Sequence, residues 1–214
     1  MGKQFGGVFA NWNGKVGNVV GRVRQGRTVL AIYQPNVYNP NTNAQQSARS
    51  KFSVLVQFLS KMLGILRVGF HDLDGYKTGN AFSAAVGYNY KNGAVTGAYP
   101  NMSIDNQKVV LSQGVVDLPY TPQVTADGTT LEVTWADNSG IGNANADDDV
   151  MLAVYNPDKD TALSTISLAK RSARNGSFAL PVAWTGDTVW VYLAVSRPGT
   201  SECSMSTLAA VLNL

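Results

Sequence analysis

The fold is decided by residues 39–67, which read NPNTNAQQSARSKFSVLVQFLSKMLGILR. The opening Asn39-Pro40-Asn41-Thr42 is typical of a turn and an N-cap, because Asn and Thr side chains accept hydrogen bonds from the first amides of a helix. Apolar or small residues then recur every three or four positions, at Ala44, Ala48, Phe52, Leu55, Leu59, Met62 and Leu66. This spacing puts them on one stripe and predicts a single amphipathic helix.

Further signals bound this helical region. Gly69 is expected to end the first helix. Asn80 is a candidate N-cap for a second helix, from Ala81 to about Lys91, which Asn92-Gly93 would end. We expect the two helices to pair, and we favour a role in core packing over partner docking for the first one.

The N-terminal third of the chain is basic. Residues 1–71 hold nine Lys and Arg residues and no Asp or Glu, giving a net charge of +9, whereas the remainder has a net charge of −6. Such a split favours either a polyanionic partner or neighbouring copies packed basic end to acidic end. The same third begins with a glycine-rich arm, whose aromatic side chains we expect to contact a partner: Phe5, Phe9 and Trp12.

Residues 16–33 predict a β-hairpin around a Gln25-Gly26 turn. With a two-residue loop, Arg24 lies opposite Arg27 and Arg22 shares their face. Like charges so close are tolerated beside solvent or a polyanion. The hairpin is therefore either a phosphate-contacting face or a solvated edge that its basic residues protect from aggregation.

From Asn101 onward the apolar pattern changes to strand spacing. Leu131, Val133 and Trp135 alternate with polar residues, as in a half-buried strand. Further strands are expected at 109–112, 150–155, 164–168, 177–182, 188–195 and 208–212. About seven short strands in roughly 105 residues favour an immunoglobulin-like sandwich, and the lack of a Cys pair makes the fibronectin type the closer match.

The predicted fold class is therefore α+β. Residues 1–104 would form the basic arm, the β-hairpin and the helix pair. Residues 105–214 would form the immunoglobulin- or fibronectin-like β-sandwich.

Residue counts argue against an enzyme. The chain has one cysteine, Cys203, and one histidine, His71, which stands near Asp72 and Asp74. A single His lacks the further ligands or the nucleophile that a metal or acid–base site needs. Phosphate-loop and nucleophile-elbow motifs are also missing. We therefore predict no catalytic residue, no metal and no cofactor.

Two clusters leave alternatives open. Asp147-Asp148-Asp149 could offer oxygen ligands to calcium, although a polar loop is favoured because the spacing is not that of an EF-hand. Four aromatic residues could form a sugar-stacking platform or belong to the core: Trp135, Trp184, Trp190 and Tyr192. Alternation places Trp190 and Tyr192 on one face of their strand.

The first residues lack the continuous apolar core of a signal peptide, and no run of 18 apolar residues occurs. We expect synthesis in the cytoplasm of the producing cell and no membrane contact.

Several motifs together resemble a known family. They are Gly14-Lys-Val-Gly-Asn-Val-Val-Gly, Asn39-Pro-Asn-Thr-Asn-Ala-Gln-Gln-Ser-Ala-Arg-Ser-Lys-Phe, Tyr99-Pro100, Leu111-Ser-Gln-Gly, Val133-Thr-Trp and Trp190-Val-Tyr-Leu. Their order is similar to that in a family of uncharacterised proteins of Bacteroidota and their phages. The Asn-Pro-x-Thr-x-x-Gln start at Asn39 also resembles a helix start in small phage structural proteins. The resemblance implies a virion component and supplies no catalytic residue.

Three functions follow as expectations. The first is a non-enzymatic structural or assembly protein of a phage virion, associated with capsid or tail and bound to other virion proteins or to copies of itself. The second is a nucleic-acid-binding module whose phosphate contacts come from Arg22, Arg24, Arg27, Arg49 and Lys51. The third is a carbohydrate-binding sandwich, for which Trp190 would be needed.

Overall fold

The computed structural model describes residues 2–4, 7, 11–24, 26–36, 38–71 and 80–214. The chain divides into two compact units, Met1–Thr42 and Asn43–Leu214. The predicted division lay after residue 104 instead. The helices belong with the C-terminal strands because side chains from both contribute to one hydrophobic core.

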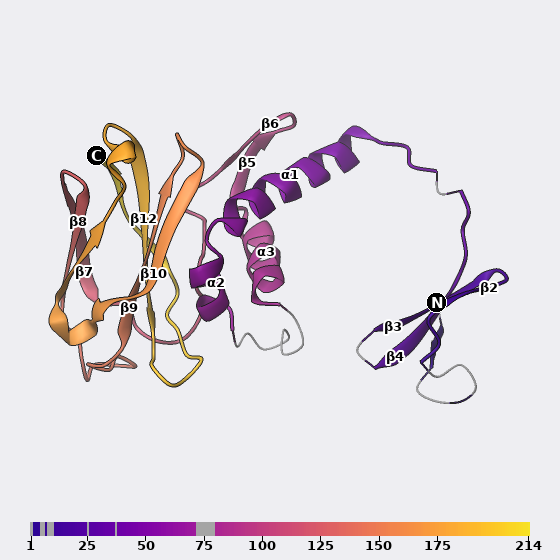
Figure 1. Cartoon of the computed structure of the whole chain (residues 1–214), viewed down its shortest axis with the longest axis horizontal. Helices are drawn as coiled ribbons and strands as arrows, with labels where there is room; N and C mark the ends of the chain where they lie inside the picture. The colour runs from indigo at the N-terminus through magenta and orange to yellow at the C-terminus, as the bar shows by residue number, and fades with distance from the viewer. Residues whose placement is uncertain (1, 5–6, 8–10, 25, 37, 72–79) are drawn as a thin grey trace. The chain divides into compact units, whose positions relative to one another are not determined.

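The N-terminal unit is a small antiparallel sheet in the order β1-β4-β3-β2 (Figure 1). Its strands are β1 (Gly2–Gln4), β2 (Gly14–Val16), β3 (Val19–Arg24) and β4 (Arg27–Ile32). The predicted hairpin is confirmed as β3 and β4, and the pairing of Arg24 with Arg27 confirms the two-residue turn. A second tight turn at Gly17-Asn18 adds β2, because Val16 pairs with Val19.

The predicted single helix is instead two helices, α1 (Asn43–Ser60) and α2 (Leu63–Gly69), bent by 95°. At the bend the amides of Lys61 and Met62 bond to carbonyls three residues earlier, at 3.3 and 3.0 Å. This tighter turn breaks the regular helical ladder. The second half of the predicted stripe is buried on both sides of the bend, at Leu55, Leu59, Met62 and Leu66.

The second predicted helix is confirmed as α3 (Ala81–Asn92). The side chain of Asn80 accepts a hydrogen bond from the Phe82 amide at 3.0 Å. Gly93 ends the helix with φ of +74°, a left-handed conformation that favours glycine. A hairpin that the sequence patterns did not indicate follows, formed by β5 (Val95–Ala98) and β6 (Asn101–Ile104).

Two further antiparallel sheets have the orders β10-β9-β12-β13 and β11-β8-β7. The strands are β7 (Tyr120–Asp127), β8 (Thr130–Ala136), β9 (Asp149–Asn156), β10 (Thr161–Lys170), β11 (Asn175–Ala179), β12 (Thr188–Ser196) and β13 (Thr207–Asn213). All the strands predicted after residue 128 are present, with end points shifted by a few residues, and β7 is additional.

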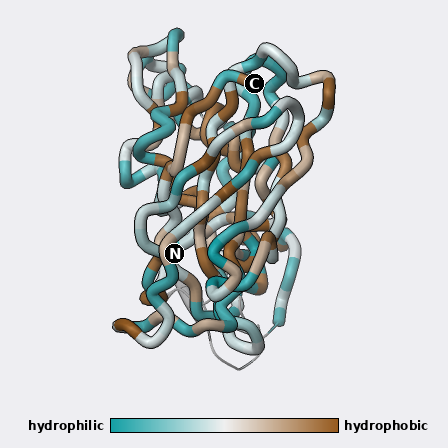
Figure 2. Tube along the Cα trace, turned by 90° about the vertical axis from the view of Figure 1, so that its left-hand side faces the viewer, coloured by the Kyte–Doolittle hydropathy of each residue, from teal (hydrophilic) through white to brown (hydrophobic). Residues whose placement is uncertain are grey.

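These elements of the C-terminal unit form three layers (Figure 1). One core fills the space between the two sheets and includes Leu131, Val133, Leu152 and Val191. A second core lies between the helices and β9 and β12. Figure 2 shows hydrophobic residues interleaved with hydrophilic ones along the chain. The unit is thus a mixed α+β structure, and its paired sheets are compatible with a β-sandwich.

The prediction of a strand at 109–112 is wrong. This segment is buried, yet its backbone is satisfied mainly by side chains. Asn89 on α3 donates to the Val110 carbonyl at 2.7 Å and accepts from its amide at 2.8 Å. The Ser206 hydroxyl accepts from the Leu111 amide at 2.7 Å. Every buried backbone group needs a hydrogen-bond partner. In this segment the side chains of Asn89 and Ser206 supply the hydrogen bonds that a neighbouring strand would otherwise supply.

Within the described residues, no single helix combines the length and apolar character that a membrane crossing requires. Together α1 and α2 reach that threshold, but only as a sharply bent pair.

Candidate functional site: a two-faced N-terminal sheet

One face of the N-terminal sheet gathers four positive charges. Residues directly opposite each other in an antiparallel pair point to the same side of the sheet. The pairs Lys15 with Val20, Arg22 with Val29, and Arg24 with Arg27 therefore share one face. We call Lys15, Arg22, Arg24 and Arg27 the basic face. All four side chains are exposed.

Lys15 is the member that sequence reasoning did not place in the site. The hairpin was taken to start at Val16, which left Lys15 outside it. The signal was present in Gly17-Asn18, which can form a two-residue turn and return the chain antiparallel to β3.

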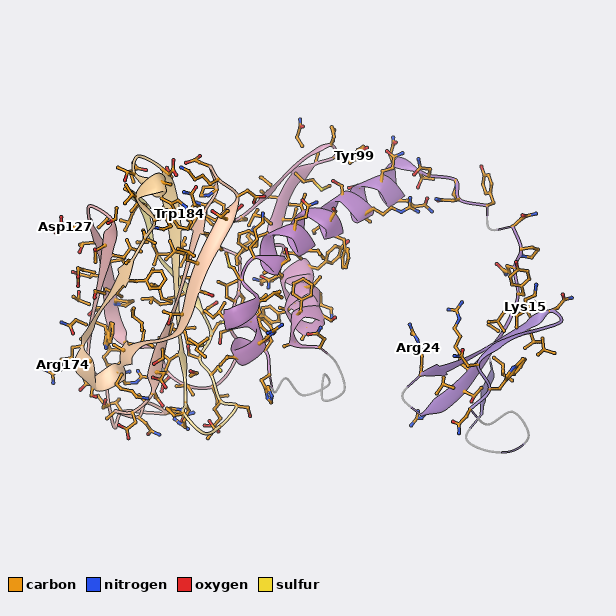
Figure 3. The ribbon with its side chains drawn as sticks, in the orientation of Figure 1. Lys15, Arg24, Tyr99, Asp127, Arg174 and Trp184 are labelled. Atoms are coloured by element: carbon orange, nitrogen blue, oxygen red, sulfur yellow. The ribbon has the colours of Figure 1, made fainter. Side chains whose placement is uncertain are left out.

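The basic face also carries an aromatic ring. The ammonium nitrogen of Lys15 lies 3.5 Å from the centroid of the Tyr33 ring, within the range of a cation–π contact. Lys15 and Arg24 lie toward opposite ends of the sheet (Figure 3). Lys15 is opposite Val20 and thus four residues from Arg24, which corresponds to about 13 Å along the strand.

The arginines lie beyond the ends of the flanking strands. β3 and β4 are the two inner strands of the sheet, but β2 pairs only with residues 19–21 of β3 and β1 only with residues 28–30 of β4. Arg22, Arg24 and Arg27 fall outside both paired segments. Basic residues often guard such strand edges against unwanted pairing, so a solvated edge and a phosphate-contacting face both stay open as interpretations of the hairpin.

The opposite face of the same sheet is apolar. We define this apolar face by the side chains that alternate with the basic ones: Val16, Val19, Val23, Leu30 and Ile32. Val16 is 63% exposed and Ile32 is 78% exposed. Trp12 covers the middle of the face, because a side chain at Gly21 would meet the Trp12 ring at 3.1 Å and its carbonyl oxygen at 2.8 Å.

Very little of this unit is buried. Among its described residues, only Gly21 and Thr28 fall in the buried class. A unit of about 40 residues rarely holds itself together without disulfides, metals or association with another surface. The cysteine of this chain lies far away at Cys203 and is buried in the other unit. The exposed apolar face therefore has the character of a contact surface.

Two of the remaining predicted site residues are on a helix and not on this sheet. Phe5 and Phe9 lie outside the described residues. Arg49 and Lys51 are on α1, which belongs to the other unit. Arg49 is exposed, and the Lys51 ammonium lies 4.8 Å from the centroid of the Tyr90 ring on α3.

An apolar groove of about 370 Å³ runs between α1 and α3. Its apolar lining consists of Phe52, Val56, Phe82, Val86 and Tyr90. Phe52 is 51% exposed, although the predicted stripe placed it in the core. The first residues of that stripe, Ala44 and Ala48, are exposed as well. The stripe is thus buried in its second half and forms an open surface in its first.

Two of the three carboxylates of the Asp147–Asp149 loop, those of Asp148 and Asp149, are engaged within the chain, and Asp147 is exposed. Asp148 is fully buried and lies 3.1 Å from the Arg171 guanidinium and 3.4 Å from that of Arg197. Asp149 pairs with Lys170 at 2.9 Å. These partners neutralise the negative charge that calcium binding would need, so the loop matches the polar-loop interpretation.

Three of the four aromatic residues considered as a sugar platform are buried in the interior, and the fourth, Trp190, is half-buried. Trp135 and Trp184 are each 5% exposed, and both belong to the core between the sheets. Figure 3 labels Trp184 in the C-terminal unit. Tyr192 is fully buried. Trp190 shares a face with Tyr192, as predicted, but the helices cover that face: its ring centroid lies 6.3 Å from Phe58 and 5.2 Å from Tyr155.

The remaining candidate residues from the sequence are the single histidine and the single cysteine. His71 is exposed just after α2, while Asp72 and Asp74 lie outside the described residues. Cys203 is buried and its sulfur donates to the Val68 carbonyl at 3.4 Å. In the part of the chain that the structure describes, no group of three or more His, Cys, Asp or Glu side chains could hold a metal ion.

The chain is therefore a mixed α+β protein in which a layered C-terminal unit follows a small two-faced sheet. The model of the family of unknown function DUF6266 matches residues 10–208, and the chain belongs to this family. The match spans both units and begins just before Trp12. No curated protein sequence matches the chain.

Proposed function

We propose that the protein is a non-enzymatic structural or assembly protein that attaches to neighbouring subunits through its N-terminal sheet. The observation that carries this proposal is the apolar face, which stays exposed on a unit with almost no buried residue of its own. Burying such a face on a neighbour would remove apolar surface from water at about 25 cal/mol per Å².

The neighbour that we propose is a second copy of this chain. The groove between α1 and α3 offers an acceptor of the same apolar chemistry, and it also remains open. A contact between two different surfaces of identical subunits is heterologous, and it generates rings or filaments according to its rotation. Repetition of one weak contact would hold many copies in place.

Charge complementarity is the weaker explanation for such an assembly. Seven carboxylates of the described residues already pair with Lys or Arg of the same chain: Asp105, Asp137, Asp148, Asp149, Asp160, Asp187 and Glu202. A basic end would thus meet few uncompensated acidic groups on its neighbour. We therefore expect the assembly to survive salt.

Size-exclusion chromatography with light scattering tests this proposal. The purified protein should form an oligomer at both 50 and 500 mM salt, since screening leaves apolar contacts in place. Ile32→Ser on the apolar face and Phe52→Ser in the groove should each shift it towards the monomer. Ile166→Ser is the matched control, because Ile166 on β10 is 49% exposed and lies outside both surfaces. A monomeric wild-type protein at micromolar concentration would contradict self-association.

The particle in which we place the protein is a phage virion, on the strength of the resemblance of the Asn39 helix start to phage structural proteins. The C-terminal sheets would then form an immunoglobulin- or fibronectin-type sandwich that decorates or projects. We expect the protein to co-purify with particles on a density gradient. Its presence only in the soluble fraction of infected cells would overturn the virion assignment while leaving self-association to be judged separately.

A further inference from the structure

We infer that the basic face is a binding site for the phosphate backbone of a nucleic acid. This inference concerns the side of the sheet opposite the apolar face and does not depend on self-association. It combines Lys15, Arg22, Arg24 and Arg27 with the ring of Tyr33.

The first argument is the concentration of positive charge. Residues 1–42 contain five Lys and Arg residues and no Asp or Glu. Arg24 lies directly opposite Arg27, and like charges in that position destabilise an antiparallel pair. A bound polyanion would convert this repulsion into attraction.

The second argument is the layout of the face. The four cations line a surface about 13 Å long, on strands that fix their spacing. Tyr33 is 41% exposed and adds an aromatic ring beside Lys15. Cations that follow a backbone, together with a ring on which a base can stack, are the usual components of a single-strand binding surface.

A lipid surface fits this arrangement less well. Peripheral membrane binding relies on cations and apolar side chains that reach the same lipid surface together. Here the cations and the exposed valines and Ile32 are on opposite faces of one sheet. Only one of the two sets can contact a planar surface at a time.

Fluorescence anisotropy with a labelled 20-nucleotide DNA, single-stranded and as a duplex, tests the inference. Four phosphate contacts predict a slope of log K against log salt of about −3.6 on the duplex, hence about a 100-fold loss of affinity between 50 and 200 mM salt. The triple variant Arg22→Gln, Arg24→Gln, Arg27→Gln should lose at least about 100-fold in affinity at 50 mM salt and flatten the slope to about −0.9.

The matched control removes the same charge elsewhere. Arg67→Gln, Lys91→Gln, Arg174→Gln neutralises three exposed cations of the other unit and should leave affinity within about threefold. An equal loss of affinity in both triple variants would show that net charge alone determines DNA binding. That result would overturn the assignment of the basic face as the binding site. No binding by the wild-type protein, or binding to anionic phosphatidylserine vesicles without binding to DNA, would overturn the inference as well. Circular dichroism of each variant verifies that the sheet content is unchanged.

Discussion

The two units differ in how their charged side chains are arranged. In Asn43–Leu214 most described carboxylates meet a cation of the same chain, and the most buried example is Arg171 with Asp148, both fully inaccessible to solvent. In Met1–Thr42 four cations share one face of the sheet, and residues 1–42 contain no Asp or Glu. Internal ion pairs suit a folded core, whereas a basic face and an exposed apolar face on one small sheet suit a unit that binds other molecules.

The largest effect should come from Arg171, which is where charge is most deeply buried. Its guanidinium donates to Asn138 at 2.7 Å, to the Asp117 carbonyl at 2.6 Å and to Asp148 at 3.1 Å. Arg171→Met removes one of the two cations beside the buried Asp148 carboxylate and leaves it with Arg197 at 3.4 Å and the Asn145 amide at 2.8 Å, and we expect a loss of about 3–5 kcal/mol in the free energy of unfolding.

Urea denaturation measures this loss. Arg174→Met is the control, because Arg174 is exposed and lies 3.8 Å from Asp137, so its replacement should cost less than about 0.5 kcal/mol. Equal costs for the two variants would show that the buried network does not stabilise the C-terminal unit as described.

Trp190 should give the next largest effect. Its half-buried ring packs on Phe58 and Tyr155, joining α1 to the sheet. We expect Trp190→Ala to destabilise the fold by about 2 kcal/mol, below the range for a fully buried Trp. Thermal unfolding measures it, with Val182→Ala on the exposed surface as the control. If Trp190→Ala were as stable as the wild type but no longer bound glycans that the wild type binds on an array, the result would support the carbohydrate-binding alternative instead.

A smaller effect should follow from the cap of α3. Asn80→Ala removes the side chain that accepts from the Phe82 amide, and we expect a cost of about 1 kcal/mol. Asn80→Ser keeps an acceptor and should restore most of the stability in the same denaturation experiment. If both variants lose the same amount, the cap is not the cause.

The smallest effect should appear at low pH. Hydrogen bonds from Lys61 and from the Tyr155 hydroxyl lower the pKa of Asp160. A lowered folded-state pKa gives stability that is present above the unfolded pKa of about 3.9 and is lost as the pH falls through the folded value. Because Asp160 is exposed, we expect the contribution to stay below about 1 kcal/mol.

Denaturation at pH 6 and at pH 3 separates this contribution. The stability difference between wild type and Asp160→Asn should shrink as the pH is lowered. Asp127→Asn, at the exposed end of β7, makes the same charge change and is the control. A difference that grows at pH 3 would have the wrong sign for this ion pair.

Local sequence patterns predicted an element well where residues close together in the sequence determine its conformation. Asn80 and Gly93 mark both ends of α3, and alternation at Leu131, Val133 and Trp135 identifies a strand buried on one side. Arg24 and Arg27 were correctly placed opposite each other from the turn length alone. In these cases a few neighbouring residues suffice.

Long-range contacts explain what the patterns missed. Residues 109–112 look like a strand because most of them are apolar, yet their backbone partners are Asn89 and Ser206. The spacing of the apolar residues is the same for one straight helix as for two helices joined by a bend after Ser60. The spacing alone could therefore not reveal the bend. Lys15 lies on the basic face because β2 pairs with β3, and this pairing was not predicted. The exposure of Trp190 likewise depended on α1, which lies far away in sequence.

Hydrogen exchange of the full chain, alone at low concentration and with the 20-nucleotide DNA, tests the contrast between the units most directly. Amides of β3 and β4 should exchange orders of magnitude faster than those of β9 and β12 in the isolated protein, because so little covers them. On addition of DNA the β3 and β4 amides should slow while β9 and β12 stay unchanged. Equal protection of both pairs of strands in the isolated protein, with no response to DNA, would contradict the N-terminal sheet as a contact module.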